Sequence, residues 1–169
     1  MLELKAQGRA RAVGVSNFNQ AHLEEIRAAG LPMPEANQIE LHPWAQKPEL
    51  LAVMARHGIA PIAYSSLAPM SSWRSAPGHD SAKTEEMRAD GAVFAEMAAK
   101  YGVSEAQLLL RWGVQRGFAV LPKSLNPDRM RQNLELGGFE IAPEDMARMA
   151  GMDRGAGVAW AVGDPSLAE

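Results

Sequence analysis

Short apolar runs of the β type alternate along the chain with segments in which apolar residues recur at helical spacing. After the first run, for example, Leu23 and Ile26 fall on one face of a helical pattern. The four runs span Ala12 to Ser16, Ala36 to Leu41, Ile59 to Ser65 and Phe118 to Leu121. Strands that alternate with helices in this way predict an α/β fold in which about four βα units share a parallel sheet.

Capping residues set the expected bounds of the helices. Asn19 suits the N-cap of the helix after the first strand, and Pro48 suits the first turn of the next. Ser104, with Gln107 three residues later, has the capping-box pattern. Glycines where these helices are expected to end are Gly30, Gly58 and Gly117. Further helices are expected near Met87 to Tyr101, from Asn126-Pro127-Asp128 through about Leu134, and from Pro143 through about Met149.

The stretch from Ser66 to about Ser81 is rich in serine, proline and glycine and is too long for a simple turn, so we interpret it as a functional loop. No linker divides the chain, and residues 1–169 are expected to form a single domain. Four βα units fit a small open sheet or one half of an eight-stranded barrel, and hydrophobic periodicity does not separate the two. Because a complete (β/α)8 barrel needs about 250 residues, a barrel built by this chain would be incomplete.

Composition narrows the class of protein. The chain is 47% hydrophobic with a formal net charge of −3, as expected of a soluble globular domain. Its 17 Lys and Arg residues are scattered, so neither nucleic acid nor an anionic membrane is an expected partner. No run of about 18 apolar residues predicts a membrane span. The lack of cysteine excludes disulfides and Cys-ligated metals and fits a reducing, cytoplasmic location, and the methionine-rich helices indicate core packing rather than a metal site.

Polar residues stand where each expected strand ends. They are Ser16 and Asn17, Gln38, Tyr64 and Ser65, and Lys123 and Ser124, in the order of the four strands. Because the carboxyl ends of parallel strands meet at one face, these side chains are expected to line one site. The helix start at Pro127 adds exposed N–H groups to the cation and hydroxyl before it, which together suit a phosphate. Taken singly, each residue is more often a cap or a solvated side chain.

Four segments resemble successive motifs of the aldo-keto reductase family, in the family's order. They are VGVSNF at 13–18, NQIELHP at 37–43, AYSSL at 63–67 and PKS at 122–124. The resemblance runs from about residue 9 to the tail. It implies a (β/α)8 TIM barrel of which this chain holds strands five to eight, and an NADP(H)-dependent oxidoreductase that reduces small aldehydes and ketones to alcohols.

The resemblance also implies which residues hold NADP. Ser16, Asn17 and Gln38 match the residues that bind the nicotinamide carboxamide, and Tyr64 matches the aromatic residue that stacks on the nicotinamide ring. Ser65 and Leu67 match the loop along the pyrophosphate. The residues that match the family's binding group for the adenosine 2′-phosphate are Lys123, Ser124 and Arg129. NADPH is therefore expected to bind better than NADH.

Two further pairs of residues have weaker matches. Gln132 and Asn133 fall where the family usually has Glu and Asn near the adenine, so the glutamine departs from the family pattern. Trp73 and Trp160 match loop aromatics that line the substrate pocket, although packing on the barrel rim explains them equally well.

The residues that carry out the reduction in this family have no counterpart in the chain. The family's general acid is a tyrosine, tuned by a lysine, an aspartate and a histidine, and the first four strands carry all of them. The two tyrosines here, Tyr64 and Tyr101, fall elsewhere. His42 is interpreted as a structural histidine, because no carboxylate that would orient it as a base is identifiable. The isolated chain is therefore expected not to catalyse reduction.

Three interpretations stay open at this point. The chain is a truncated NADPH-dependent carbonyl reductase, a non-catalytic half-barrel that binds NADP weakly or pairs with another half-chain, or the product of a disrupted gene. In the isolated chain the first and fourth strands are expected to be free sheet edges, so self-association through those edges is expected.

Overall fold

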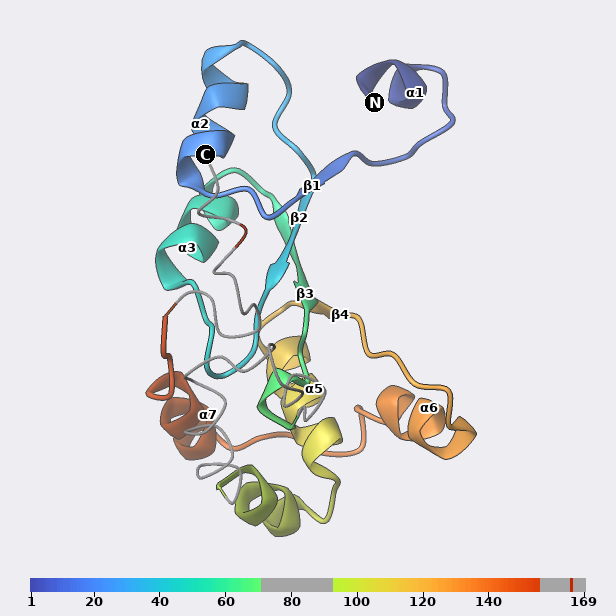
Figure 1. The fold of residues 1–169 in the computed structure, drawn as a ribbon, viewed down its shortest axis with the longest axis vertical. Helices are drawn as coiled ribbons and strands as arrows, with labels where there is room; N and C mark the ends of the chain where they lie inside the picture. Colours follow the sequence, from blue (N-terminus) through green and yellow to red (C-terminus); the bar gives the residue numbers. More distant parts are fainter. Residues whose placement is uncertain (71–92, 156–164, 166–169) are drawn as a thin grey trace, which may run out of the picture.

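A four-stranded parallel sheet forms the centre of the computed structural model, which describes residues 1–70, 93–155 and 165 (Figure 1). The strands are β1 (Gly14–Ser16), β2 (Ala36–Glu40), β3 (Ala60–Tyr64) and β4 (Ala119–Val120), and they lie in chain order. All neighbouring pairs are parallel, so the expected α/β fold of four βα units is confirmed. Each strand is one or two residues shorter than expected, because end residues such as Ile59 and Phe118 are buried without joining the ladder.

Helices cover one face of the sheet and extend beyond its ends (Figure 1). The strand connections contain α2 (Gln20–Ala28), α3 (Pro48–Arg56), a helix over 93–101 and α5 (Glu105–Gln115). The 3₁₀ turn η1 (Ala68–Met70) also lies in the connection between β3 and β4, whereas α1 (Leu2–Ala6), α6 (Pro127–Leu134) and α7 (Pro143–Ala150) lie outside the strand connections. In the described ranges, none of these helices combines the length and apolarity needed to cross a bilayer.

Both helix caps predicted from serine or asparagine are present. The Asn19 side chain accepts from the backbone N–H of His22 at 3.0 Å, and the His22 ring accepts from the Asn19 N–H at 3.2 Å. Ser104 and Gln107 form the same reciprocal pair at the start of α5. At the other end of α5, Gly117 has φ +80°, which an L side chain rarely adopts, and this explains why the helix ends there.

The hydrophobic core lies between the sheet and the helices. Successive side chains of a strand point to opposite faces, and Ile39 and Ala63, both 0% exposed, point to the helix-covered face. Leu108 and Trp112 of α5 belong to the same buried cluster. The other face of the sheet is far less covered, as residues such as Ala60 are exposed there.

An aspartate at the start of α7 ties this helix to the one over 93–101. Lys100 Nζ donates to Asp145 Oδ2 at 2.6 Å, and the Tyr101 hydroxyl donates to the same oxygen. The Tyr101 oxygen in turn accepts from the Ala142 N–H at 2.9 Å. The hydrogen bond from Lys100 is the largest effect that lowers the pKa of Asp145, followed by the bond from Tyr101.

Replacing this carboxylate is expected to change how stability depends on pH. Since the pKa of Asp145 is lower in the folded chain than in the unfolded one, its ionised form stabilises the fold above the unfolded pKa, and this contribution is lost as the pH falls through the folded pKa. In Asp145→Asn, the free energy of unfolding should be lower at neutral pH, and unfolding in acid should take up about one proton less. Urea unfolding from pH 7 to pH 3 measures this.

Glu144→Gln is the matched control, because Glu144 lies 3.5 Å from the same lysine but its side chain is 69% exposed. Its stability curve should follow the unmodified chain. Parallel pH curves for Asp145→Asn and the unmodified chain would contradict the assigned role.

Candidate cofactor-binding site

Polar residues at the ends of β1 and β3 are brought together on either side of Gln38 of β2. Ser16 stands opposite Gln38 in the sheet, and its hydroxyl donates to the Gln38 carbonyl at 3.0 Å. The Asn17 N–H donates to the same carbonyl at 2.9 Å. The Tyr64 hydroxyl donates to Asn17 Oδ1 at 2.8 Å, so the side chains that follow β1 and end β3 meet, and the β2 strand between them contributes the Gln38 carbonyl.

A buried asparagine holds the turn that presents Asn17. This residue has φ +58°, in the left-handed region that asparagine tolerates better than most residues. The Asn37 side chain, 0% exposed, accepts from the Phe18 N–H at 3.3 Å and donates to the Phe18 carbonyl at 2.8 Å. Asn37 lies in a recognised motif, but its role as a support for the site depends on a contact that the sequence does not display.

Two amide groups beside Tyr64 remain available for a ligand. Asn17 Nδ2 and the Gln38 carboxamide make no hydrogen bond within the described part of the chain, and both residues are half-buried. Beyond β3 the chain turns at Ser65, which has φ +54°, and Leu67 packs against the core. Amide donors and acceptors beside an aromatic ring fit a flat heteroaromatic ring that carries a carboxamide.

A second group of predicted residues follows β4. Ser124 Oγ accepts from the Asn126 N–H at 3.1 Å, which orders the turn into α6. Lys123 and Arg129 are exposed and make no ion pair with any described residue, whereas Asp128 pairs with Arg131 at 2.8 Å. The two unpaired cations leave positive charge available for an anion. Gln132 and Asn133 lie on the last turns of α6.

One expectation about this group is wrong. The N–H groups at the start of α6 are not exposed for a phosphate, because Asn126 Oδ1 accepts from the N–H of Asp128 at 2.9 Å and of Arg129 at 3.2 Å. Pro127 has no N–H to offer. An anion at this position would therefore be bound by side chains such as Lys123.

His42 has a carboxylate partner that was not identified from the sequence. Its Nε2 lies 2.8 Å from Glu40 Oε1, and both side chains are 0% exposed. Two residues apart on an extended chain, they project from the same side, a spacing that was available in the sequence as a signal. A buried, paired imidazole agrees with the interpretation of His42 as a structural residue.

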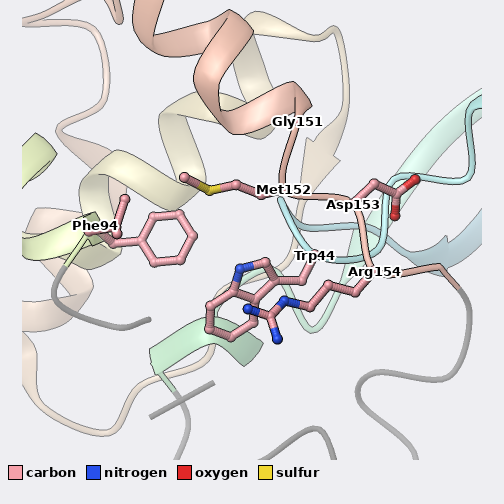
Figure 2. Close-up of a pocket in the computed structure, with 7 residues that line it drawn as sticks. Trp44, Phe94, Gly151, Met152, Asp153 and Arg154 are labelled. Carbon is pink, nitrogen blue, oxygen red and sulfur yellow. The ribbon is translucent and has the colours of Figure 1, made fainter. Parts of the chain in front are cut away.

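A cavity of about 350 Å³ lies away from these residues (Figure 2). The Arg154 guanidinium stands over the Trp44 ring, 4.9 Å from its centre, and the Phe94 ring centre is 5.4 Å from that of Trp44. None of the predicted NADP-holding residues lines it. The two predicted substrate-pocket residues, Trp73 and Trp160, lie outside the described residues.

The chain resembles known proteins in both sequence and structure. A family model described as the aldo/keto reductase family matches residues 1–154. The chain belongs to this family. Its fold is accordingly part of an aldo/keto reductase TIM barrel, as the motif order predicted.

Individual aldo/keto reductases give the same result. The chain is 37% identical to NADPH-dependent D-xylose reductase of Meyerozyma guilliermondii over 147 residues, 87% of this chain and 46% of that protein. It is 37% identical to aldo-keto reductase family 1 member A1 of Xenopus tropicalis, covering 91% of this chain and 45% of that one. The chain spans about half the length of the curated relatives it matches.

Solved structures agree with the sequence relatives. The Bombyx mori aldo-keto reductase in complex with NADP has a TM-score of 0.78 at 32% identity, covering 91% of this chain and 48% of that chain. Apo Gox0644 has a TM-score of 0.74 at 34% identity, covering 90% and 51%. The likeness again extends over about half of each solved chain.

Proposed function

We propose that this chain is the cofactor-holding half of an NADPH-dependent aldo-keto reductase, which reduces small aldehydes and ketones to alcohols when the barrel is complete. The observation that carries the proposal is the contact between Asn17, which follows β1, and Tyr64, which ends β3, beside Gln38 of the strand between them. The Meyerozyma relative is named an NADPH-dependent reductase and the Bombyx mori structure holds NADP, which supports the proposal. A chain without cysteine suits a cytoplasmic enzyme.

The residues at the strand ends fit the nicotinamide of this cofactor. When bound, NADPH supplies the hydride for the reduction. Asn17 Nδ2 and the Gln38 amide would bind the carboxamide of the ring, while Ser65 and Leu67 would follow the pyrophosphate. Tyr64, held in place by Asn17 Oδ1 at 2.8 Å, offers its ring for stacking. Fixing the carboxamide and one ring face together would decide which side of the nicotinamide faces the substrate.

The residues after β4 fit the adenosine end of the cofactor. Lys123 and Arg129 would bind the 2′-phosphate, with the Ser124 hydroxyl as a further donor, and Arg129 contributes the planar fork that matches phosphate oxygens. Gln132 and Asn133 would lie beside the adenine. Because Asn126 occupies the helix N–H groups, selectivity for NADPH would rest on these side chains.

We further propose that this chain lacks the general acid of the reaction. Its sequence has two tyrosines. The Tyr64 hydroxyl is bound to Asn17, and the Tyr101 hydroxyl is bound to Asp145. Burial is the main cause that raises the pKa of Tyr101, and its bond to Asp145 raises the pKa further, so this phenol is a poor proton donor. On its own, the chain would bind NADPH without using it.

Removal of the guanidinium fork should weaken NADPH binding. In Arg129→Ala the affinity for NADPH is expected to fall about tenfold or more, because a charge-assisted contact with the 2′-phosphate is lost. The affinity for NADH, which has no phosphate at that position, should stay within about twofold. Titration of cofactor fluorescence measures both values.

Arg131→Ala is the matched control, because Arg131 lies on the same helix but is paired with Asp128. It should leave the ratio of the two affinities unchanged. Equal losses in the two arginine variants would show that general positive charge, and not a phosphate contact, explains the binding.

A further inference from the structure

The segment that contains α7 and the turn after it docks on the rest of the chain through few buried side chains. We call residues 141–154 the strap. Three of its fourteen residues are buried, namely Ile141, Asp145 and Met149, and only the first and the last of these belong to the hydrophobic core. A segment that buries so little apolar surface depends on polar contacts to stay in place.

Side chains of two helices hold the N-terminal end of the strap. Gln115 of α5 accepts from the Ile141 N–H at 2.7 Å and donates to the Ile141 carbonyl at 3.1 Å. Tyr101, which ends the helix over 93–101, accepts from the Ala142 N–H at 2.9 Å and donates to Asp145. The strap is thus attached to both helices within its first five residues.

A buried glutamine holds the C-terminal end of the strap. Gln46, which lies in the loop between β2 and α3, is 4% exposed. Its Nε2 donates to the carbonyls of Met149 at 2.8 Å and Ala150 at 3.2 Å, and to Pro43 of its own loop at 2.7 Å. The last carbonyls of a helix have no partner within the helix, so Gln46 supplies a donor that α7 needs. The Gln46 N–H also donates to Asp153 Oδ1 at 3.2 Å.

Arg116, at the end of α5, fixes the orientation of the Gln46 amide. Its Nη1 donates to Gln46 Oε1 at 2.6 Å, which turns the Nε2 of that side chain toward α7. The guanidinium lies 4.9 Å from the ring centre of Trp112 and 5.3 Å from that of Phe118. Burial lowers the pKa of Arg116, whereas the charge of Asp153 acts in the opposite direction. Because arginine stays charged in proteins, this partly dehydrated cation needs the Gln46 oxygen as an acceptor.

The last residues of the strap form one wall of the cavity beside Trp44. Figure 2 shows Met152 and Arg154 of the strap next to the rings of Trp44 and Phe94. The Arg154 N–H donates to the Trp44 carbonyl at 2.9 Å, and its guanidinium covers the indole ring. Movement of the strap away from this position would uncover the Trp44 ring and open the cavity.

We propose that the strap opens as one unit and that Gln46 and Arg116 form the latch that keeps it closed over the cavity beside Trp44. The helical hydrogen bonds of α7 join the two ends of the strap, so the contacts at one end support those at the other. Gln46 is therefore a positioning residue, which acts on the cavity through residues 149–154. The proposal goes beyond the proposed function, since none of the predicted NADP-holding residues belongs to the strap.

Hydrogen exchange of the unmodified full chain, followed by mass spectrometry in a series of low urea concentrations, tests the proposal. Peptides from the strap should exchange through one common opening, at lower urea than peptides from β2 and β3 at the centre of the sheet. Exchange of the strap only when β2 and β3 also exchange would overturn the proposal, as would separate openings of its two ends. No cofactor is added, so this result leaves the proposed function untouched.

Gln46→Leu removes the polar group of the latch and keeps a side chain of similar size. It should speed exchange of the strap peptides about tenfold or more, because the buried hydrogen bonds to α7 and Arg116 are lost, and should leave β2 and β3 unchanged. Gln20→Leu is the matched control, since Gln20 is exposed at the start of α2. Equal strap exchange in the two variants would overturn the assignment of the latch. If Gln46→Leu unfolds the whole chain, the urea series on the unmodified chain still decides whether the strap opens as a unit.

Discussion

The purified chain alone is expected to leave NADPH unoxidised when a reactive aldehyde such as a nitrobenzaldehyde is added. A positioned general acid contributes about 10²–10⁴-fold to a reaction of this type. In this chain the hydroxyls of Tyr64 and Tyr101 are bound to Asn17 and Asp145. Without a proton for the developing alkoxide, transfer of a hydride from bound NADPH would not be completed. The loss of absorbance at 340 nm measures turnover.

The positive control is the same assay on a complete aldo-keto reductase, such as the one from Bombyx mori. Tyr64→Phe serves as the internal control for the chain, since it removes the phenolic hydroxyl at the candidate site and keeps an aromatic ring. If the isolated chain turned over the aldehyde and Tyr64→Phe abolished this activity, Tyr64 would be the proton donor and the proposal of a missing general acid would be wrong.

Truncation of Trp112 is expected to destabilise the chain by about 3–5 kcal/mol, the range for loss of a fully buried large side chain. Trp112 is 1% exposed on α5, and its ring meets that of Phe118 edge to face at 5.9 Å. The Arg116 guanidinium covers the ring at 4.9 Å. Trp112→Ala therefore removes the packing that joins α5 to the strand after it. Urea unfolding followed by circular dichroism gives the free energy.

Val114→Ala is the comparison on the same helix, because Val114 is 38% exposed. It should change stability by about 0.5 kcal/mol or less. A similar small effect in Trp112→Ala would mean that the space around the indole collapses without cost, and that the core beneath α5 is not closely packed.

Local patterns in the sequence were enough to predict the order of the elements. Alternation and capping act over a few residues, so Asn19 and Ser104 could be recognised as caps from their own neighbourhoods, and both are. The places of Ser16 and Tyr64 followed from a general property of parallel sheets, which brings the last residues of neighbouring strands to one end without any knowledge of their contacts, whereas Gln38 lies in the middle of β2.

The contacts that hold the site in place could not be predicted from the sequence, because each polar side chain has several possible hydrogen-bond partners in the folded chain. Asn37 was identified as part of a motif, but its neighbours in the sequence do not show that its amide group is hydrogen-bonded to the backbone of Phe18. Asn126 was recognised near a helix start. The first N–H groups of this helix were nevertheless expected to be available for a phosphate, whereas the Asn126 side chain accepts hydrogen bonds from two of them. His42 was interpreted without a carboxylate partner, although it forms a buried pair with Glu40.

The cap formed by Asn126 bears on how cofactor preference can evolve. Where backbone N–H groups bind a phosphate, preference is a property of the fold and is hard to change by substitution. Here those groups are occupied, and under the proposed function the preference for NADPH rests on Lys123 and Arg129, which are exposed and support no other described contact. A single nucleotide change at either codon can then alter the preference without disturbing the helix, so descendants of this sequence can exchange one redox pool for another at little cost to folding.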